Sequence, residues 1–499
     1  MNRKDFPNLQ SRRDFFRQAA CAAVGSLSIA TTIRDLRFIN TAVAQETLTD
    51  YKALVCIFLS GGNDSNNLII PIGATEYPNY KAVRQNLALY EAIQNPHPTN
   101  PLRNVLPVTS VNPDGHDYGM HPDCGELHTL VGEKKAAVLF NVGPLLYPLT
   151  RTQYSNNSVA KPPQLFSHSD QVTHWQTSLP DRPPSSGWGG RIADLIHPMQ
   201  YQLVGGIPTA NSAKIALCTS LAGANTFEVG DTFAQYHVST SGAVALSGVT
   251  GARLQAVKDI LSLGSVNLQR TAFADVSENA LAVGDLLNAS IAATAAANYW
   301  TVPFPNTNNS TSLGSQLRMV ARLIAARVPL NMKRQVFFTS VGGYDTHTAQ
   351  TGNGAAPTDT SVGAHANLLN ELSEAIYAFQ RAMEQIGTSN MVTSFTASDF
   401  GRTFKTNGQG SDHAWGSHHI VVGGAVNGNA YTTIGAFPEL NVSGPDAVPS
   451  STEGRWIPKI AVDQYSATLA KWFGVSSSNM GTVFPNIGHF ATPDLGFML

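Results

Sequence analysis

The chain has 499 residues, of which 42% are hydrophobic and only 13% are charged. The formal net charge of -2 provides no basic surface for nucleic acid or for an anionic membrane, so we expect neither as a partner. Soluble domains usually carry about 25% charged residues, so the polar surface must come largely from Ser, Thr, Asn and Gly. Such a surface suits an extracytoplasmic protein.

The first 44 residues have the features of an export signal. Paired arginines precede two aromatic residues in 11–16 (SRRDFF), a weakly apolar stretch covers 19–30, and residues 42–44 (AVA) are the small residues that a signal peptidase accepts. Together these parts predict a signal peptide over residues 1–44, and the paired arginines favour the twin-arginine route. Polar residues within 31–35 (TTIRD) interrupt the apolar stretch, which is too short for a membrane anchor of roughly 20 residues.

We therefore expect contact with the twin-arginine translocase during export, cleavage after Ala44, no stable membrane anchor, and a periplasmic or otherwise extracytoplasmic location. This route carries proteins that fold before they cross, which favours a bound ion without identifying one. Cys56, Cys124 and Cys218 remain after cleavage, and an odd number without CxxC spacing predicts no disulfide framework. Cys56 is expected in the core, whereas Cys124 and Cys218 could either pair or stay free.

Four short apolar runs, rich in β-branched and aromatic residues, predict buried parallel strands. Amphipathic segments lie between them, including a helix expected over residues 368–383 and a helical region over 254–297. This alternation predicts an α/β fold with a doubly wound, mostly parallel sheet and helices on both faces. We expect one such domain over residues 45–499, with residues 147–308 as a cap or insertion rich in loops and helices. The four strands are expected at residues 54–59, 136–143, 336–341 and 391–397.

Three of these runs are followed by turn residues and then by an acid. Asp64, Asp345 and Asp399 each stand just past a strand, and parallel strands place their carboxyl ends at one edge of the sheet. His347 follows Asp345 by two residues, and His413 lies downstream of Asp399. Each acid alone could be a turn former. Together, carboxylates and imidazoles without thiolates predict a site for Zn²⁺, Mn²⁺ or a related ion.

Several short motifs accompany these strand ends and the starts of helices. In combination they resemble the recurrent motifs of the domain-of-unknown-function family 1501, across essentially the whole of residues 45–499. That family in turn resembles the alkaline phosphatase and sulfatase superfamily, whose members hold one or two divalent metal ions with Asp and His at strand ends. The motifs are residues 59–64 (LSGGND), 121–122 (HP), 167–171 (SHSDQ), 187–191 (GWGGR), 342–347 (GGYDTH), 399–403 (DFGRT), 412–416 (DHAWG) and 462–465 (VDQY).

The resemblance implies an alkaline-phosphatase-like fold that holds one or two divalent ions, Zn²⁺, Mn²⁺ or Ca²⁺. Asp64 matches the acid after the first strand, and Asp345 with His347 matches a middle acid–histidine pair. Asp399 matches the late-strand acid, and His413 matches the final histidine.

One departure concerns the second ion. The superfamily usually has Asp-His-Gly after the late strand, whereas Phe400 takes the place of that histidine here. Because phenylalanine cannot bind a metal, a second ion is either absent or completed by another residue, such as Asp412 or His418.

Superfamily enzymes carry their nucleophile at a helix start, where backbone N–H groups favour an anion. The resemblance implies Ser167 in that role, with Ser169 as the alternative, although serines at helix starts more often serve as N-caps. Arg402, three residues after Asp399, could fix a phosphate or sulfate by paired hydrogen bonds or instead anchor a loop carboxylate. No cysteine stands at the nucleophile position, which disfavours a sulfatase that uses an oxidised cysteine.

The leading hypothesis is an exported metal-dependent hydrolase of phosphate or sulfate esters, acting on a small-molecule or polymeric anionic ester. The alternative is a non-catalytic extracytoplasmic binding or surface protein that keeps the fold. Phe400 and the undecided nucleophile favour that alternative. A redox enzyme is disfavoured, since the sequence has no cysteine cluster and no GxGxxG motif after the first strand.

Overall fold

The computed structural model describes residues 48–499 apart from residues 110, 112–113, 201–202, 205–206, 209–211, 234, 244–247, 264–266, 295–299 and 353–358. The expected export signal and its cleavage site lie outside these residues. The cysteines expected to remain after cleavage, Cys56, Cys124 and Cys218, are all buried and free. Among the residues described, no helix is both long and apolar enough to cross a bilayer.

One large sheet forms the centre of the molecule, with strands in the order β10-β9-β8-β11-β1-β12-β13-β5-β14, and with β15 beside β5. β1 runs parallel to its neighbours β11 and β12, whereas β13 runs antiparallel between β12 and β5. The predicted doubly wound, mostly parallel α/β fold is therefore confirmed. The strands are β1 Lys52–Leu59, β5 Ala136–Gly143, β8 Cys218–Ser220, β9 Tyr236–Ser239, β10 Gly242–Ala243, β11 Arg334–Val341, β12 Val392–Ser398, β13 Ser417–Gly423, β14 Thr433–Ile434 and β15 Ile460–Ala461.

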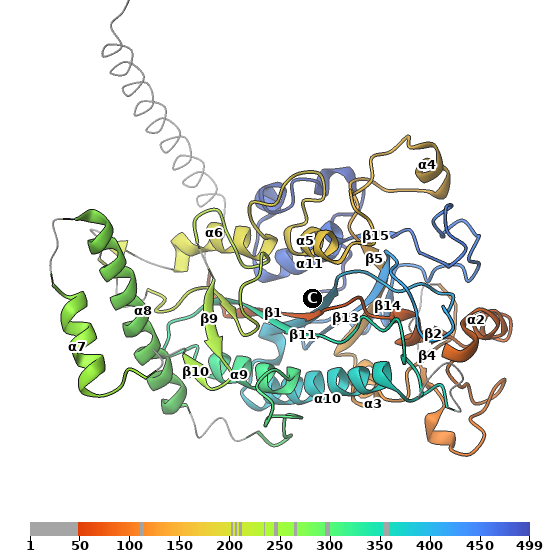
Figure 1. The fold of residues 1–499 in the computed structure, drawn as a ribbon, viewed down its shortest axis with the longest axis horizontal. Helices are drawn as coiled ribbons and strands as arrows, with labels where there is room; N and C mark the ends of the chain where they lie inside the picture. The colour runs from red at the N-terminus through yellow and green to blue at the C-terminus, as the bar shows by residue number, and fades with distance from the viewer. Residues whose placement is uncertain are drawn as a thin grey trace, which may run out of the picture.

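Helices cover both faces of this sheet (Figure 1). On one face lie α3 (Gly125–Gly132), α9 (Leu313–Ala325) and α10 (Ala364–Gln385), and on the other lie α5 (His168–Thr177), α6 (Trp188–Gln200) and α11 (Val462–Phe473). The helix expected over residues 368–383 falls within α10. The remaining helices and small-sheet strands are α2 Glu76–Arg84, α4 Arg151–Asn156, α7 Ala252–Leu261, α8 Leu268–Ala293, α12 Met480–Val483, β2 Ile69–Pro71, β3 Leu106–Val108, β4 Tyr118–Met120, β6 Leu203–Val204 and β7 Ile207–Pro208.

The side chains of β1 explain why its sequence is apolar without interruption. Val55 and Ile57 point to the core shared with α9 and α10, whereas Leu54, Cys56 and Phe58 point to the core shared with α6 and α11. Both faces of the strand are covered, so no position favours a polar residue.

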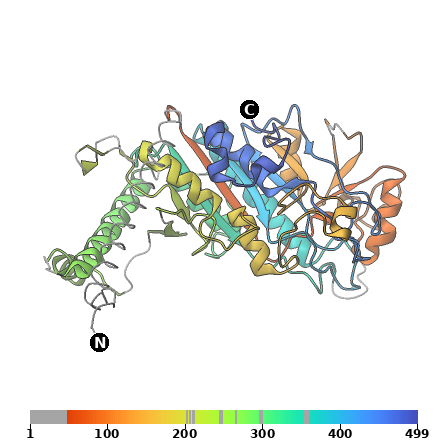
Figure 2. The same cartoon turned by 90° about the horizontal axis from the view of Figure 1, so that it is seen from above.

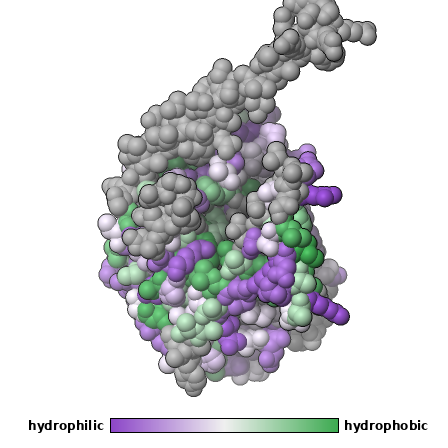
Figure 3. Space-filling model, turned by 90° about the vertical axis from the view of Figure 1, so that its left-hand side faces the viewer, coloured by the Kyte–Doolittle hydropathy of each residue, from purple (hydrophilic) through white to green (hydrophobic). Residues whose placement is uncertain are grey.

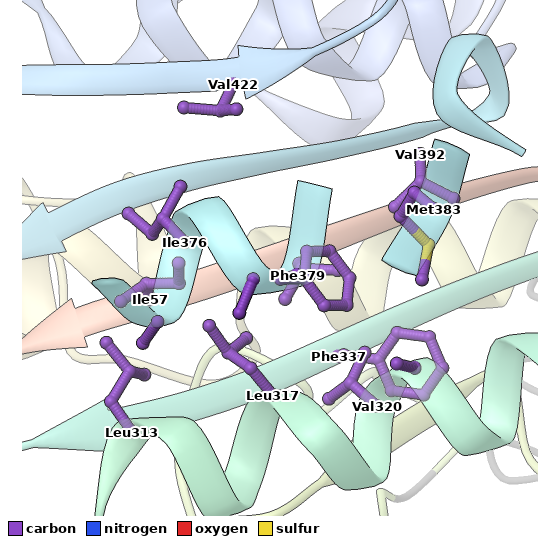
Figure 4. Close-up of a cluster of buried hydrophobic side chains, with 14 of the residues drawn as sticks. Ile57, Leu313, Leu317, Val320, Phe337, Ile376, Phe379, Met383, Val392 and Val422 are labelled. Atoms are coloured by element: carbon purple, nitrogen blue, oxygen red, sulfur yellow. The ribbon is translucent and has the colours of Figure 1, made fainter. Parts of the chain in front are cut away.

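Figure 4 shows the first of these two cores between the sheet and its helices. Leu317 and Val320 of α9 pack with Ile376 and Phe379 of α10 and with Phe337 of β11. Fully burying a side chain of this size stabilises the fold by roughly 1.5–3 kcal/mol.

The segment expected to form a cap, residues 147–308, is partly built into the main layers. It supplies α5, α6 and the strands β8, β9 and β10. These strands have only two to four residues each, too few to show a strand period in the sequence. Within the helical region expected over 254–297, the described residues form α7 and α8, which extend at one end of the molecule (Figure 2), and residues 264–266 and 295–297 lie outside the described part. That end presents apolar side chains interspersed with polar ones (Figure 3).

The three central strands end at the same level. Leu59 at the end of β1 pairs with Val341 of β11 on one side and with Ser398 of β12 on the other. The segments that follow these strands, and that carry Asp64, Asp345 and Asp399, therefore start from one edge of the sheet. This is the shared edge that strand polarity predicted.

Candidate metal centre

Three histidine side chains meet beyond this edge, and each comes from a different part of the chain. His168 is the first residue of α5, His347 lies in the loop after β11, and His413 lies between β12 and β13. The Nε2 atom of His413 is 3.0 Å from Nε2 of His168 and 2.9 Å from Nε2 of His347. The Nε2 atoms of the three histidines therefore face one small region.

The other ring nitrogen of each histidine contacts an oxygen that can only accept a hydrogen bond. His168 Nδ1 is 2.7 Å from Asp399 Oδ2, and His347 Nδ1 is 2.7 Å from Asp412 Oδ1. His413 Nδ1 is 2.9 Å from the carbonyl oxygen of Phe166. Each Nδ1 therefore carries a proton and donates it, and in the neutral form of each imidazole this leaves a lone pair on Nε2. Partners of this kind orient the imidazoles of metal sites.

Asp345 brings a carboxylate to the same region. Its Oδ1 is 3.1 Å from His347 Nε2 and 3.4 Å from His413 Nε2, and its Oδ2 is 3.6 Å from His168 Nε2. Ligand atoms of His168, Asp345 and His413 all lie within 4.8 Å of one another, and His347 joins them on the side of Asp345 and His413. Zinc–nitrogen bonds of about 2.0–2.1 Å imply ligand atoms roughly 3.3 Å apart in a tetrahedral site. The donors of His168, Asp345 and His413 therefore fit one divalent cation, whereas His347 is not part of the set whose ligand atoms all lie within this range.

Arg402 forms an ion pair with Asp345. Its side chain is fully buried, and its Nη1 donates to Asp345 Oδ1 at 2.6 Å and to the carbonyl oxygen of Gly61 at 3.2 Å, while its Nη2 donates to the carbonyl oxygen of Ser411. Partial burial raises the pKa of the Asp345 carboxyl, but the hydrogen bond and charge of Arg402 outweigh it and hold that pKa below its usual range. Asp345 is therefore an anionic donor.

The centre is open to solvent. The side chains of Asp345 and His347 are 47% and 41% exposed, and those of His168 and His413 are 35% and 25% exposed. Structural zinc sites are closed, whereas catalytic sites leave a position for water or substrate. The exposure of these four side chains is typical of the second kind.

The predicted metal ligands divide into two groups in the structure. Asp345, His347 and His413 converge as expected. Asp399 contacts a histidine of the centre instead of facing the metal position itself. Its Oδ2 contacts His168 Nδ1, and its Oδ1 accepts the backbone N–H of Gly61 at 3.1 Å. Asp64 is fully buried and forms an ion pair with Arg84, so its carboxylate does not face the centre.

His168 is the functional residue that the sequence reasoning passed over. It lies within residues 167–171 (SHSDQ), a motif that drew attention to its two serines. No spacing rule connects His168 with histidines about 180 and 245 residues further along the chain. The signal that could have identified His168 is its position as the first residue of a helix that points at the sheet edge.

Ser167 directly precedes His168 at the start of α5. Its Oγ donates to Asp170 Oδ2 at 2.6 Å and makes no capping hydrogen bond to the helix backbone. Ser169 Oγ lies 3.3 Å from Ser167 Oγ and is more exposed. The simple N-cap interpretation of Ser167 therefore does not describe its side chain.

Comparison with known proteins identifies a family for the chain. No curated protein matches it. A family model described as "Protein of unknown function (DUF1501)" matches residues 51–448, a span that includes the central strands and all four converging side chains. The chain therefore belongs to the domain-of-unknown-function family 1501.

Proposed function

We propose that this protein is an exported, metal-dependent hydrolase of phosphate or sulfate esters. The observation that supports it best is the cluster of His168, Asp345 and His413, whose ligand atoms all lie within 4.8 Å of one another, with His347 Nε2 2.9 Å from His413 Nε2. Lone pairs at such distances repel each other unless a metal cation or a shared proton lies between them. An accessible cation with an open position is suited to an anionic ester from solution.

His168, His413 and Asp345 would hold the cation and leave a fourth position for water or the ester, with His347 beside them. Imidazole ligands favour Zn²⁺ over Mn²⁺ and Ca²⁺, because Mn²⁺ and Ca²⁺ prefer oxygen ligands. When bound, the cation would polarise the ester and stabilise the negative charge that builds as the bond to the leaving oxygen breaks.

Ser167 is the nucleophile that we favour. It is adjacent to the ligand His168, and its Oγ–H points at the Asp170 carboxylate, which can take the proton as Oγ bonds to phosphorus or sulfur. The bond to the leaving oxygen breaks as that bond forms, and the oxygen takes a proton from water and leaves as the alcohol. A water molecule then hydrolyses the seryl ester, which releases phosphate or sulfate and restores the Ser167 Oγ–H. Arg402 would then act through Asp345 rather than on the ester, since its guanidinium is buried and bonded to the protein.

Metal-stripped and metal-reloaded protein tests this function. We expect the reloaded protein to hydrolyse one or more of 4-nitrophenyl phosphate, bis(4-nitrophenyl) phosphate and 4-nitrophenyl sulfate, and the stripped protein to hydrolyse none.

Asp345→Asn should lower both metal content and melting temperature, since metal binding is linked to folding. Ser167→Ala should keep the metal and reduce kcat by roughly 1,000-fold or more, whereas Ser169→Ala should have a small effect.

Two results would contradict the proposal. Activity that survives complete removal of metal would separate hydrolysis from this centre. Metal binding without hydrolysis of any ester would favour the alternative, a non-catalytic extracytoplasmic binding protein.

A further inference from the structure

Asp64 lies at the edge where metal ligands were expected, but protein donors surround its carboxylate. Both Arg84 Nη2 and Gln350 Nε2 donate to its Oδ2. Asn66 Nδ2 donates to its Oδ1 at 3.3 Å. The side chains of Asp64 and Arg84 are both completely buried. The Asp64 carboxylate is therefore enclosed by donors from the protein itself.

Arg84 is fixed in its place by further hydrogen bonds. Its Nε donates to Asn67 Oδ1 at 3.2 Å, and its Nη1 donates to the carbonyl oxygens of Thr403 and Phe404 at 3.2 and 3.1 Å. All three guanidinium nitrogens thus have acceptors, and the side chain cannot turn away without breaking several buried bonds. Burial raises the pKa of Asp64, but the charge of Arg84 outweighs it and the pKa falls below its usual range.

The other candidates for a second ion offer too few ligand atoms. Phe400 has no donor atom, and Asp412 keeps only Oδ2, because its Oδ1 accepts from His347 Nδ1 at 2.7 Å and from Asn407 Nδ2 at 2.9 Å. His418 is buried, and its Nδ1 accepts the backbone N–H of Asn141 at 3.0 Å. The proton of His418 is therefore on Nε2, which leaves that atom without a lone pair for a metal. These residues do not fit a second cation.

We infer that the guanidinium of Arg84 takes the place of a second cation at this edge, and that the protein holds one divalent cation per chain. The inference rests on the metal centre of the proposed function and specifies its stoichiometry. Any reaction there must then proceed with one cation rather than with the pair that clamps both reacting oxygens in two-metal sites.

The Asp64–Arg84 pair instead connects the loops that carry the side chains of the metal centre. Asn66 Nδ2 donates to the carbonyl oxygen of Arg402 at 2.9 Å, and Ser411 Oγ donates to Gln350 Oε1 at 2.7 Å. Asp64 is therefore a positioning residue, connected to the loops around Arg402 and His413 through its own hydrogen-bond partners.

Counting bound metal tests this directly. The purified chain is stripped with a chelator, reloaded with Zn²⁺ or separately with Mn²⁺, freed of unbound ion, and analysed for metal per chain by mass spectrometry. We expect one ion per chain in the wild type, in Asp64→Asn and in Arg84→Lys, with a melting temperature lowered by several degrees in Asp64→Asn. A double variant, His168→Ala with His413→Ala, should retain close to none.

Two ions in the wild type, falling to one in Asp64→Asn, would overturn the inference and leave the proposed metal centre intact. No ion in the wild type would remove the centre and the inference together. If Asp64→Asn does not fold, the wild-type count and Arg84→Lys still decide, because a second ion would appear in the wild type itself.

Discussion

Each imidazole of the centre depends on an acceptor that is not itself a ligand. Asp399 and Asp412 perform this task for His168 and His347, at the same distance of 2.7 Å. They differ in what else their oxygens do. Asp399 uses one oxygen for His168 and the other for the N–H of Gly61. Asp412 receives both His347 and Asn407 on the single atom Oδ1.

This difference predicts unequal effects of the same substitution. Asp399→Asn has one acceptor for two donors, so the contact with either His168 or Gly61 is lost, and we expect metal affinity to fall roughly 10–100-fold. Asp412→Asn keeps Oδ1 for both of its partners and should weaken metal binding much less. Metal affinities measured by competition with a chromogenic chelator compare the two variants. Equal affinities in both would show that Asp399 does not act through His168.

At the scale of elements, the centre is built by turns that leave three strands at one level. The turn after β1 comes close to the segment after β11. Gly61 has φ +116°, and a Cβ at that position would lie 2.4 Å from the backbone nitrogen of Asp345. The close approach of these two loops also lets the carbonyl oxygen of Gly61 accept from Arg402.

Gly61→Ala should therefore disturb the metal centre, although Gly61 is not one of its converging residues. An alanine there is strained in its backbone, at a cost of roughly 1–3 kcal/mol, and pushes directly on the segment that carries Asp345. We expect a lower melting temperature and weaker metal binding, measured by thermal unfolding with and without Zn²⁺. Gly342→Ala is the matched control, since a Cβ at Gly342 meets nothing within 4 Å. Similar behaviour of the two variants would contradict this account of the β1 turn.

At the scale of the whole molecule, the proposed export route is consistent with a centre assembled from distant segments. Its four converging side chains come from residues 168 to 413, so the ion can be bound only after most of the chain has folded. A route that carries folded proteins allows the ion to be loaded before export. Such loading would protect the site from competing metals outside the cytoplasm.

We predict that replacing Arg12 and Arg13 together by lysine retains the precursor in the cytoplasm. Lysine keeps the charge but loses the planar guanidinium that distinguishes arginine in recognition. Cell fractionation followed by immunoblotting measures the share of processed protein outside the cytoplasm. Arg17→Lys, a neighbouring change outside the pair, should be exported normally. Undiminished export of the double-lysine variant would rule out the twin-arginine assignment.

The sequence by itself determined the class of fold, the main strands and the edge where polar groups gather. Uninterrupted apolar runs such as residues 54–59 identify strands covered on both faces, and the shared polarity of parallel strands places their ends together. This reasoning also predicted that Asp345, His347 and His413 would be near neighbours. Each of these steps depends on a local pattern or on a general property of sheets.

Only the tertiary structure decided which polar groups face the centre. Asp64, Asp345 and Asp399 all follow strands, yet Asp64 meets Arg84 from α2, and Asp399 meets His168 from α5. These partners lie 20 and 231 residues away in the chain, and their approach depends on how helices pack on the sheet. Strand polarity places a carboxylate at the sheet edge. The side chains that contact it in the folded protein then determine whether it is available to a metal, orients a histidine or neutralises an arginine.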